Sequence, residues 1–186
     1  MNSYKVADPY QRDVVGMVTE WAEGFEQRVK RGEGLVLMGP VGTGKDHLAF
    51  GAVARGVSTT GASALWVACR ELFGASRDAM SGDEAERRFV RTYVSPDVLI
   101  LSDPTPPVGD GLTSWQSDVL FRIVDTRWRS LKPTVVTANF ADDRDAENAV
   151  GAPTWDRITD RAFVALTNWG SFRKSVRRLE PKGGRP

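Results

Sequence analysis

The sequence predicts an α/β fold in which helices cover both faces of a mainly parallel sheet. Two observations support this class. Short apolar runs alternate along the chain with longer segments of helical periodicity, which is the pattern of βαβ units. A glycine-rich loop at residues 39–46 joins the first apolar run to a helical segment. The composition fits a globular domain, since 41% of the 186 residues are hydrophobic and 26% are charged.

Each expected element has a simple pattern behind it. A first helix is predicted over residues 9–31, because apolar side chains recur there in steps of three and four. The helix after the glycine loop should end near Gly56, and Asp83 should cap a later helix. Residues 140–153 are polar and are predicted to be a loop with at most one helical turn. The other helices are expected at 69–80, 83–92, 112–130 and 154–162, and the strands at 34–38, 64–68, 97–101, 133–139 and 163–167.

Length and charge bound the organisation of the chain. We expect one domain over residues 1–180 and a basic flexible tail over 181–186. A net charge of +1 gives no global argument for nucleic acid or membrane binding. Cys69 is the single cysteine, so no intramolecular disulfide can form, and a buried filler role is expected for it. No membrane span or signal-peptide core is recognisable, which predicts a cytoplasmic protein with no membrane partner.

The glycine loop has the pattern of a phosphate-binding loop. Its glycines let backbone N–H groups curl round an anion, the following helix adds its positive N-terminal dipole, and Lys45 supplies a point charge. The usual pattern G-x-x-x-x-G-K-[ST] ends in a hydroxyl residue that binds magnesium, but the eighth position here is Asp46. His47, the only histidine, is interpreted as a surface or capping residue. The expected nucleotide-binding residues are Gly39, Pro40, Val41, Gly42, Thr43, Gly44, Lys45, Asp46 and His47.

Polar residues lie at the carboxyl ends of three expected strands, which meet at one edge of the sheet. Asp46, Ser102, Asp103 and Asn139 all lie where ligands bind in open parallel sheets. A purely structural role remains an alternative for two of these residues. Asp103 can cap the turn at Pro104, and Asn139 can be a turn-forming residue.

The chain resembles the AAA+ ATPases of the DnaC/IstB-like group, which includes helicase loaders and transposition helpers. The resemblance rests on residues 34–49, 112–116, 120–123, 132–139, 156–161 and 167–173, and it covers about residues 10–178. It implies a P-loop NTPase fold of the AAA+ type, a three-layer αβα sandwich with a mainly parallel five-stranded sheet. It also implies ATP and Mg²⁺ as cofactors, and ATP hydrolysis as the activity.

The resemblance assigns roles to several positions. Lys45 matches the lysine that holds the outer phosphates, and Asp103 the acid that activates water. Asn139 matches the sensor residue, and Arg173 the second sensor arginine. Arg161 matches the arginine finger that reaches the nucleotide of a neighbouring subunit, although Arg157 lies one turn away as an alternative.

Two departures from the family pattern fall on the magnesium site. The loop hydroxyl is replaced by Asp46, and the first Walker B acid is replaced by Ser102. Both the carboxylate count and the hydroxyl count are unchanged, so we expect a reciprocal exchange with Asp46, Ser102 and Asp103 as metal-site residues. The alternative is a damaged site, because an uncompensated carboxylate repels a triphosphate by about 1 kcal/mol at ~4 Å in water and by more in a cleft.

The resemblance also suggests partners. It implies a homo-oligomer joined through the Arg161 edge, DNA as a partner, and a helicase or transposase as a protein partner. The first predicted helix begins at residue 9, so no loader-type N-terminal domain is expected, and a transposition-type helper is favoured. There is also little room for a helical lid after Arg173. Basic residues that can meet DNA phosphates are Arg87, Arg88 and Arg91, and in the tail Arg173, Lys174, Arg177, Arg178, Lys182 and Arg185.

Two other function classes remain open from the sequence. One is a nucleotide-gated binding module with weak or no hydrolysis, because of the altered magnesium site. The other is a P-loop small-molecule kinase, for which we find no arginine-rich lid and no acceptor pocket in the sequence.

Overall fold

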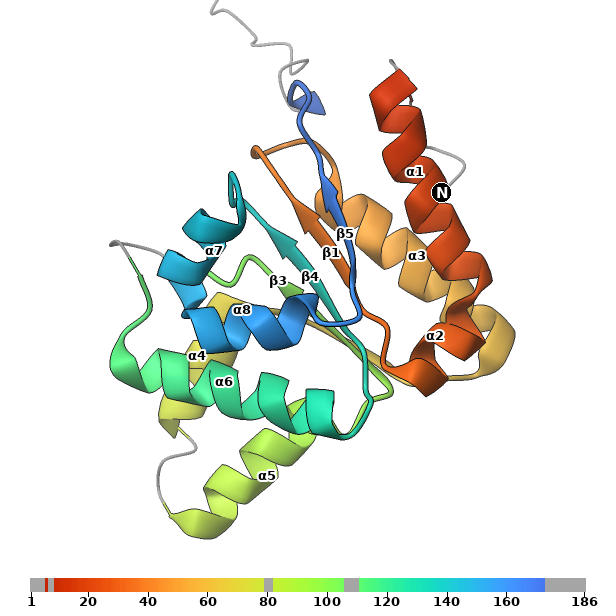
Figure 1. The fold of residues 1–186 in the computed structure, drawn as a ribbon. Coiled ribbons are helices and arrows are strands. Elements are labelled where there is room, and N and C mark those ends of the chain that lie inside the picture. Colours follow the sequence, from red (N-terminus) through yellow and green to blue (C-terminus); the bar gives the residue numbers. More distant parts are fainter. Residues whose placement is uncertain (1–5, 7–8, 79–81, 106–110, 173–186) are drawn as a thin grey trace, which may run out of the picture.

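The fold is a five-stranded parallel sheet between two layers of helices, as the sequence predicted (Figure 1). This computed structural model describes residue 6 and residues 9–78, 82–105 and 111–172. The strands are β1 (Leu35–Met38), β2 (Ala64–Ala68), β3 (Val98–Ser102), β4 (Thr134–Ala138) and β5 (Phe163–Leu166). Their order across the sheet is β2-β3-β4-β1-β5, and every neighbouring pair is parallel. The carboxyl ends of all five strands therefore meet at one edge.

Alternation along the strands divides the core in two. Leu35 and Leu37 face a cluster built with the helices α1 (Pro9–Glu23), α2 (Phe25–Arg31) and α3 (Lys45–Thr60). Val36 and Met38 point to the opposite face, which packs against the remaining helices (Figure 1). These are α4 (Cys69–Asp78), α5 (Asp83–Val94), α6 (Ser114–Arg129), α7 (Asp143–Val150) and α8 (Ala152–Thr159). Both faces are covered, which explains strands that are apolar at almost every position.

Glycines account for two differences between expectation and structure in the first layer. The helix predicted over residues 9–31 is interrupted at Gly24 and forms α1 and α2, because glycine weakens a helix interior. The helix α3 runs past Gly56 to Thr60 and ends at Gly61, whose φ is +71°. Gly56 instead lets the helix approach Phe25 closely, since a Cβ at that position would lie 2.1 Å from the ring.

Helix starts account for two further differences. The polar stretch predicted as a loop contains α7, which is eight residues long and begins after Asp142. The Asp142 side chain accepts a hydrogen bond from the N–H of Asp145 and so caps the helix. Gly82, rather than Asp83, occupies the N-cap of α5. By contrast, Thr113 and Gln116 form a capping box at the start of α6, close to the predicted boundary.

Candidate nucleotide-binding site

The glycine loop joins β1 to α3 at the carboxyl edge of the sheet. Gly39, Gly42 and Gly44 have φ values of +132°, +84° and +89°, which residues with side chains rarely adopt. Lys45 is the first residue of α3 and is 7% exposed. The loop therefore has the left-handed backbone and the following helix that an anion cradle needs.

Hydrogen bonds link Lys45 to the ends of β4 and β3. Its Nζ donates to the carbonyl oxygens of Gly39 (2.7 Å) and Pro40 (2.8 Å), and to Oδ1 of Asn139 (3.0 Å). Asn139 in turn donates from Nδ2 to Oδ1 of Asp103 at 3.1 Å. Three residues singled out separately in the sequence thus form one continuous chain of contacts.

Asp103 has an unusual backbone. Its φ is +53°, one of three positive values among the described residues other than glycine. Its N–H donates to the carbonyl of Thr137 at 2.8 Å, and Thr105 Oγ1 donates to its carboxylate at 3.0 Å. The side chain therefore takes part in the local turn and also meets Asn139. Left-handed backbone at a non-glycine residue costs about 1–3 kcal/mol and is often found at functional sites.

Asp46 meets Ser102, and these are the two positions at which the sequence departs from the family pattern. Ser102 Oγ donates to Asp46 Oδ1 at 3.0 Å, and Thr137 Oγ1 donates to the same oxygen at 2.5 Å. Sequence reasoning did not find Thr137. The available signal was its place near the end of β4, where it is the register partner of Ser102.

The donor set at this edge fits magnesium. The described residues contain no group of three or more His, Cys, Asp or Glu side chains that could hold a metal alone. The site offers instead the carboxylates of Asp46 and Asp103 with the hydroxyls of Ser102 and Thr137. Magnesium typically takes one or two protein carboxylates and completes its shell with phosphate oxygens and water.

A segment after β5, residues 167–172, packs on the glycine loop, and we call it the strap. Thr167 Oγ1 lies 2.8 Å from Thr43 Oγ1, and Trp169 Nε1 donates to the Thr43 carbonyl at 3.0 Å. The N–H of Phe172 donates to the Gly42 carbonyl at 2.9 Å. The strap holds the loop by its carbonyls, a feature that the sequence did not reveal. Arg173 and the basic tail follow it and lie outside the described residues.

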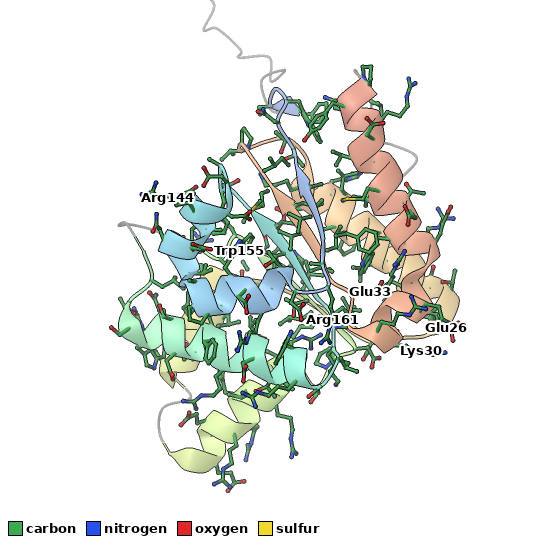
Figure 2. All side chains as sticks on the ribbon, viewed as in Figure 1. Glu26, Lys30, Glu33, Arg144, Trp155 and Arg161 are labelled. Carbon is green, nitrogen blue, oxygen red and sulfur yellow. The ribbon has the colours of Figure 1, made fainter. Side chains whose placement is uncertain are left out.

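Arg161 lies away from this edge. It lies two residues before Phe163, the first residue of β5, at the amino end of the sheet (Figure 2). Its side chain is 42% exposed, its φ is +61°, and its Nε lies 3.4 Å from Asp160. The structure does not bring it to the glycine loop of its own chain.

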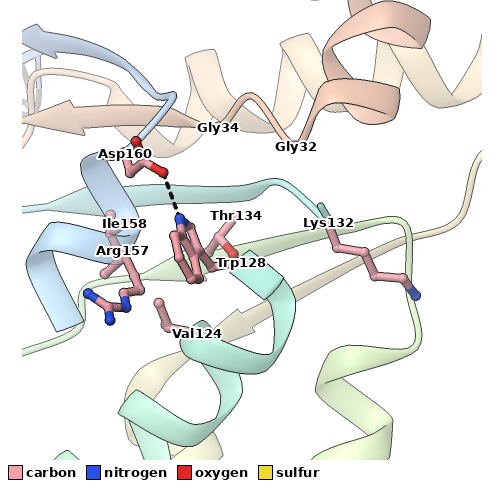
Figure 3. Close-up of a pocket in the computed structure, with 9 residues that line it drawn as sticks. All are labelled: Gly32, Gly34, Val124, Trp128, Lys132, Thr134, Arg157, Ile158 and Asp160. Atoms are coloured by element: carbon pink, nitrogen blue, oxygen red, sulfur yellow. Dashed lines mark hydrogen bonds between the residues drawn. The ribbon is translucent and has the colours of Figure 1, made fainter. Parts of the chain in front are cut away.

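Arg157, the alternative finger, is more firmly held than Arg161. It contacts carboxylates of Asp125 and Asp156, at 3.4 and 2.7 Å, and its guanidinium lies 4.9 Å from the ring centre of Trp128. Arg157 and Trp128 line a pocket at the amino end of the sheet, where Trp128 donates to Asp160 at 2.7 Å (Figure 3). Arg161 is the less constrained of the two.

Four other residues singled out in the sequence lie on the surface. His47 is exposed in the first turn of α3. Arg87, Arg88 and Arg91 are exposed on α5, and Arg88 pairs with Glu84 at 3.3 Å. The helix α5 lies at the opposite end of the molecule from the glycine loop (Figure 1). Within the described part of the chain, no helix is both long and apolar enough to cross a membrane.

Comparison with known proteins identifies related sequences. The family described as "IstB-like ATP binding protein" matches residues 25–179. An ATP-binding protein in an insertion sequence of Mycobacterium tuberculosis (strain H37Rv) is 30% identical over 153 residues. That match covers 78% of this chain but 58% of the relative, so the chain spans little more than half of that protein.

Solved structures share the fold. The DnaC helicase loader matches with a TM-score of 0.78 at 20% identity, over 89% of this chain and 94% of that one. DnaI matches with a TM-score of 0.69 at 23% identity, over 91% and 88%. AMPPCP-bound DnaA from Aquifex aeolicus matches with a TM-score of 0.66 at 17% identity, over 87% of this chain and 48% of that one. At these identities the likeness establishes the P-loop NTPase architecture.

Proposed function

The chain belongs to the IstB-like ATP-binding family, and we propose that it binds ATP with magnesium at residues 39–46, hydrolyses the ATP and acts on DNA. The observation that carries this proposal is the chain of contacts from Lys45 through Asn139 to Asp103. In this chain an ammonium group, an amide and a carboxylate lie side by side. Phosphoryl transfer needs these groups, since it depends on charge stabilisation and a positioned water.

Each side chain has a role in this proposal. The N–H groups of the loop and Lys45 bind the phosphates, and Lys45 leaves the loop carbonyls to do so. Asn139 orients the attacking water, and Asp103 accepts its proton. Asp46 and Asp103 hold magnesium, with Ser102 in support, and the ion when bound neutralises phosphate charge.

The partners follow from the relatives and from Arg161. We propose that copies of the chain assemble head to tail, so that Arg161 of one copy reaches the nucleotide of the next. Its exposure and its distance from its own loop support this arrangement. The names of the relatives favour a role with DNA, as a transposition helper beside a transposase or as a loader beside a helicase.

One titration tests the proposal. ATP turnover is measured against DNA concentration for the wild type, for Arg161→Ala and for the matched control Arg129→Ala, an exposed arginine of α6. We expect DNA to stimulate the wild type and the control, and Arg161→Ala to lose turnover by about 10³-fold, as for other arginine fingers. Turnover that ignores both DNA and Arg161 would contradict the oligomeric DNA-stimulated ATPase.

The second candidate is a nucleotide-gated binding module with little or no hydrolysis. It is favoured by Ser102, which stands where the family pattern has an acid and which donates its hydrogen bond to Asp46. Magnesium-dependent turnover of the wild type, with and without DNA, separates the two candidates. The variants Asp46→Thr and Asp46→Thr/Ser102→Asp test the exchange itself. If Asp46→Thr keeps full turnover and the second change adds nothing, the exchange between these positions is wrong.

A further inference from the structure

We propose that Thr137 and Ser102 are positioning residues that grip one oxygen of Asp46 and leave the other, Oδ2, to face the metal. This inference rests on the proposed function and deepens it. It gives Thr137 a role in the site and makes the carboxylate a one-oxygen ligand.

Strand register brings the two hydroxyls together. Ser102 of β3 and Thr137 of β4 are direct partners in the parallel ladder. They continue the alternation of Ile100 and Val135, which face the core cluster under α3. Their side chains thus point to the face of the sheet on which α3 begins, and Asp46 lies in the first turn of that helix.

The hydrogen bonds are divided unequally between the two oxygens of the carboxylate. Both hydroxyls contact Oδ1, at 3.0 and 2.5 Å. A carboxylate only accepts, so both hydroxyls donate, and two donors occupy the two lone-pair sites of that oxygen. From the described residues, Oδ2 receives no hydrogen bond. The contacts fix the rotation of the carboxyl group and leave one oxygen with its full capacity to bind a cation.

Burial separates this arrangement from an ordinary structural contact. Ser102 is 6% exposed and Thr137 is 2% exposed, whereas Asp46 is exposed. The two hydroxyls are held rigidly in the sheet, and the carboxylate reaches from solvent onto them. An exposed aspartate gains little stability from such contacts, but a metal ligand gains a fixed position before the ion arrives.

The length of the Asp46 side chain explains why it needs hydrogen bonds to hold one of its oxygens. The serine or threonine of the usual pattern places its oxygen one bond from Cβ, and aspartate places its oxygens two bonds away with an extra rotatable bond. Holding Oδ1 removes that added freedom. The replacement of the loop hydroxyl therefore requires hydroxyls elsewhere, and β3 and β4 supply them.

The test measures how strongly magnesium promotes nucleotide binding, independently of turnover. Dissociation constants for AMPPCP are determined by calorimetry with excess magnesium and with EDTA. The quantity compared between variants is the dissociation constant in EDTA divided by the dissociation constant in magnesium. Thr137→Val should lower this ratio at least about 10-fold, as loss of an outer-shell partner does at other metal sites. Thr137→Ser should restore it, and Ser102→Ala should lower it in the same direction. Thr134→Val, a buried control on the same strand, should leave it unchanged.

The outcomes distinguish the inference from the proposed function. If the wild type binds AMPPCP tightly and the ratios for Thr137→Val and Ser102→Ala lie within about twofold of wild type, the positioning role of the two hydroxyls is wrong. The proposed ATP site is then unaffected. Absence of AMPPCP binding by the wild type overturns both. A thermal unfolding scan of each variant without nucleotide identifies any loss of folding, and if Thr137→Val does not fold, Ser102→Ala decides the result.

Discussion

Replacing Arg127 by methionine should destabilise the fold strongly. Arg127 lies on α6 with no exposed surface. Its guanidinium donates to the carbonyls of Tyr93, Val94, Pro96, Asp97 and Pro133 and to Thr134 Oγ1. It therefore ties the end of α5 to the starts of β3 and β4. Burial lowers the pKa of this guanidinium from 12.5 to about 10, so it remains charged at neutral pH.

The size of the effect follows from which acceptors lose their partner. Val94 keeps a hydrogen bond from Lys132, and Pro133 keeps one from the N–H of Leu99. The carbonyls of Tyr93, Pro96 and Asp97 have no other hydrogen bond from the described residues. An unsatisfied buried acceptor costs about 1–3 kcal/mol. Methionine also removes a buried charge and keeps an apolar stem, and both effects offset part of this cost. We therefore expect the free energy of unfolding to fall by about 3–5 kcal/mol.

Urea unfolding measures this loss directly. A domain of this kind has a free energy of unfolding of about 5–15 kcal/mol, so Arg127→Met should move the midpoint clearly without abolishing folding. The matched control is Arg129→Met on the same helix. Arg129 is exposed and pairs with Asp125 at 2.7 Å, and its loss should cost at most about 1 kcal/mol.

A decrease in unfolding free energy below about 1 kcal/mol for Arg127→Met, with an unchanged slope against urea concentration, would refute this prediction. It would mean that water replaces the guanidinium at all three carbonyls. A loss of the same size in the Arg129 control would show that methionine on α6 is harmful for a general reason.

Three further predictions concern other parts of the molecule. Cys69 is buried and burial raises the pKa of its thiol, so iodoacetamide at pH 8 should label it only after unfolding in urea. Hydrogen bonds from the N–H and hydroxyl of Ser63 lower the pKa of Asp97 below 3.8, so its stabilisation is present above that pH and is lost on acidification. The difference in unfolding free energy between wild type and Asp97→Asn should therefore shrink between about pH 5 and pH 2, and a constant difference would contradict this. Gly42→Ala should lower stability by about 1–3 kcal/mol, because φ is +84° and the new Cβ would lie 2.0 Å from Ser171 Oγ. Adding Ser171→Gly should recover part of the loss in thermal unfolding, whereas no recovery would mean that backbone strain alone is responsible.

Local patterns predicted most of the fold and failed at identifiable places. The buried strands were found because each is a short, nearly continuous apolar run between polar turns. The end of α3 was misplaced because a glycine inside a helix resembles a stop signal, and only the packing of Phe25 shows why Gly56 is there. The helix α7 was missed because it is short and mostly polar, although Ala146, Ala149 and Val150 recur at helical spacing and Asp142 and Gly151 mark its two ends.

The site was predicted unevenly for a related reason. The loop, Lys45 and Asn139 carry recognisable local signals, and counting oxygen ligands paired Asp46 with Ser102. Thr137 was not found, because a threonine in a β-branched strand is ordinary.

By itself, the sequence determined the family, the strand–helix alternation and the position of the glycine loop, since these depend on residues close together in the chain. The tertiary structure alone decided which side chains meet. It placed Thr137 beside Ser102, laid the strap on the loop, and left Arg161 less constrained than Arg157. The physical reason is that strand pairing and helix packing fix contacts between segments far apart in sequence, and a local pattern does not say which residue of another strand lies opposite.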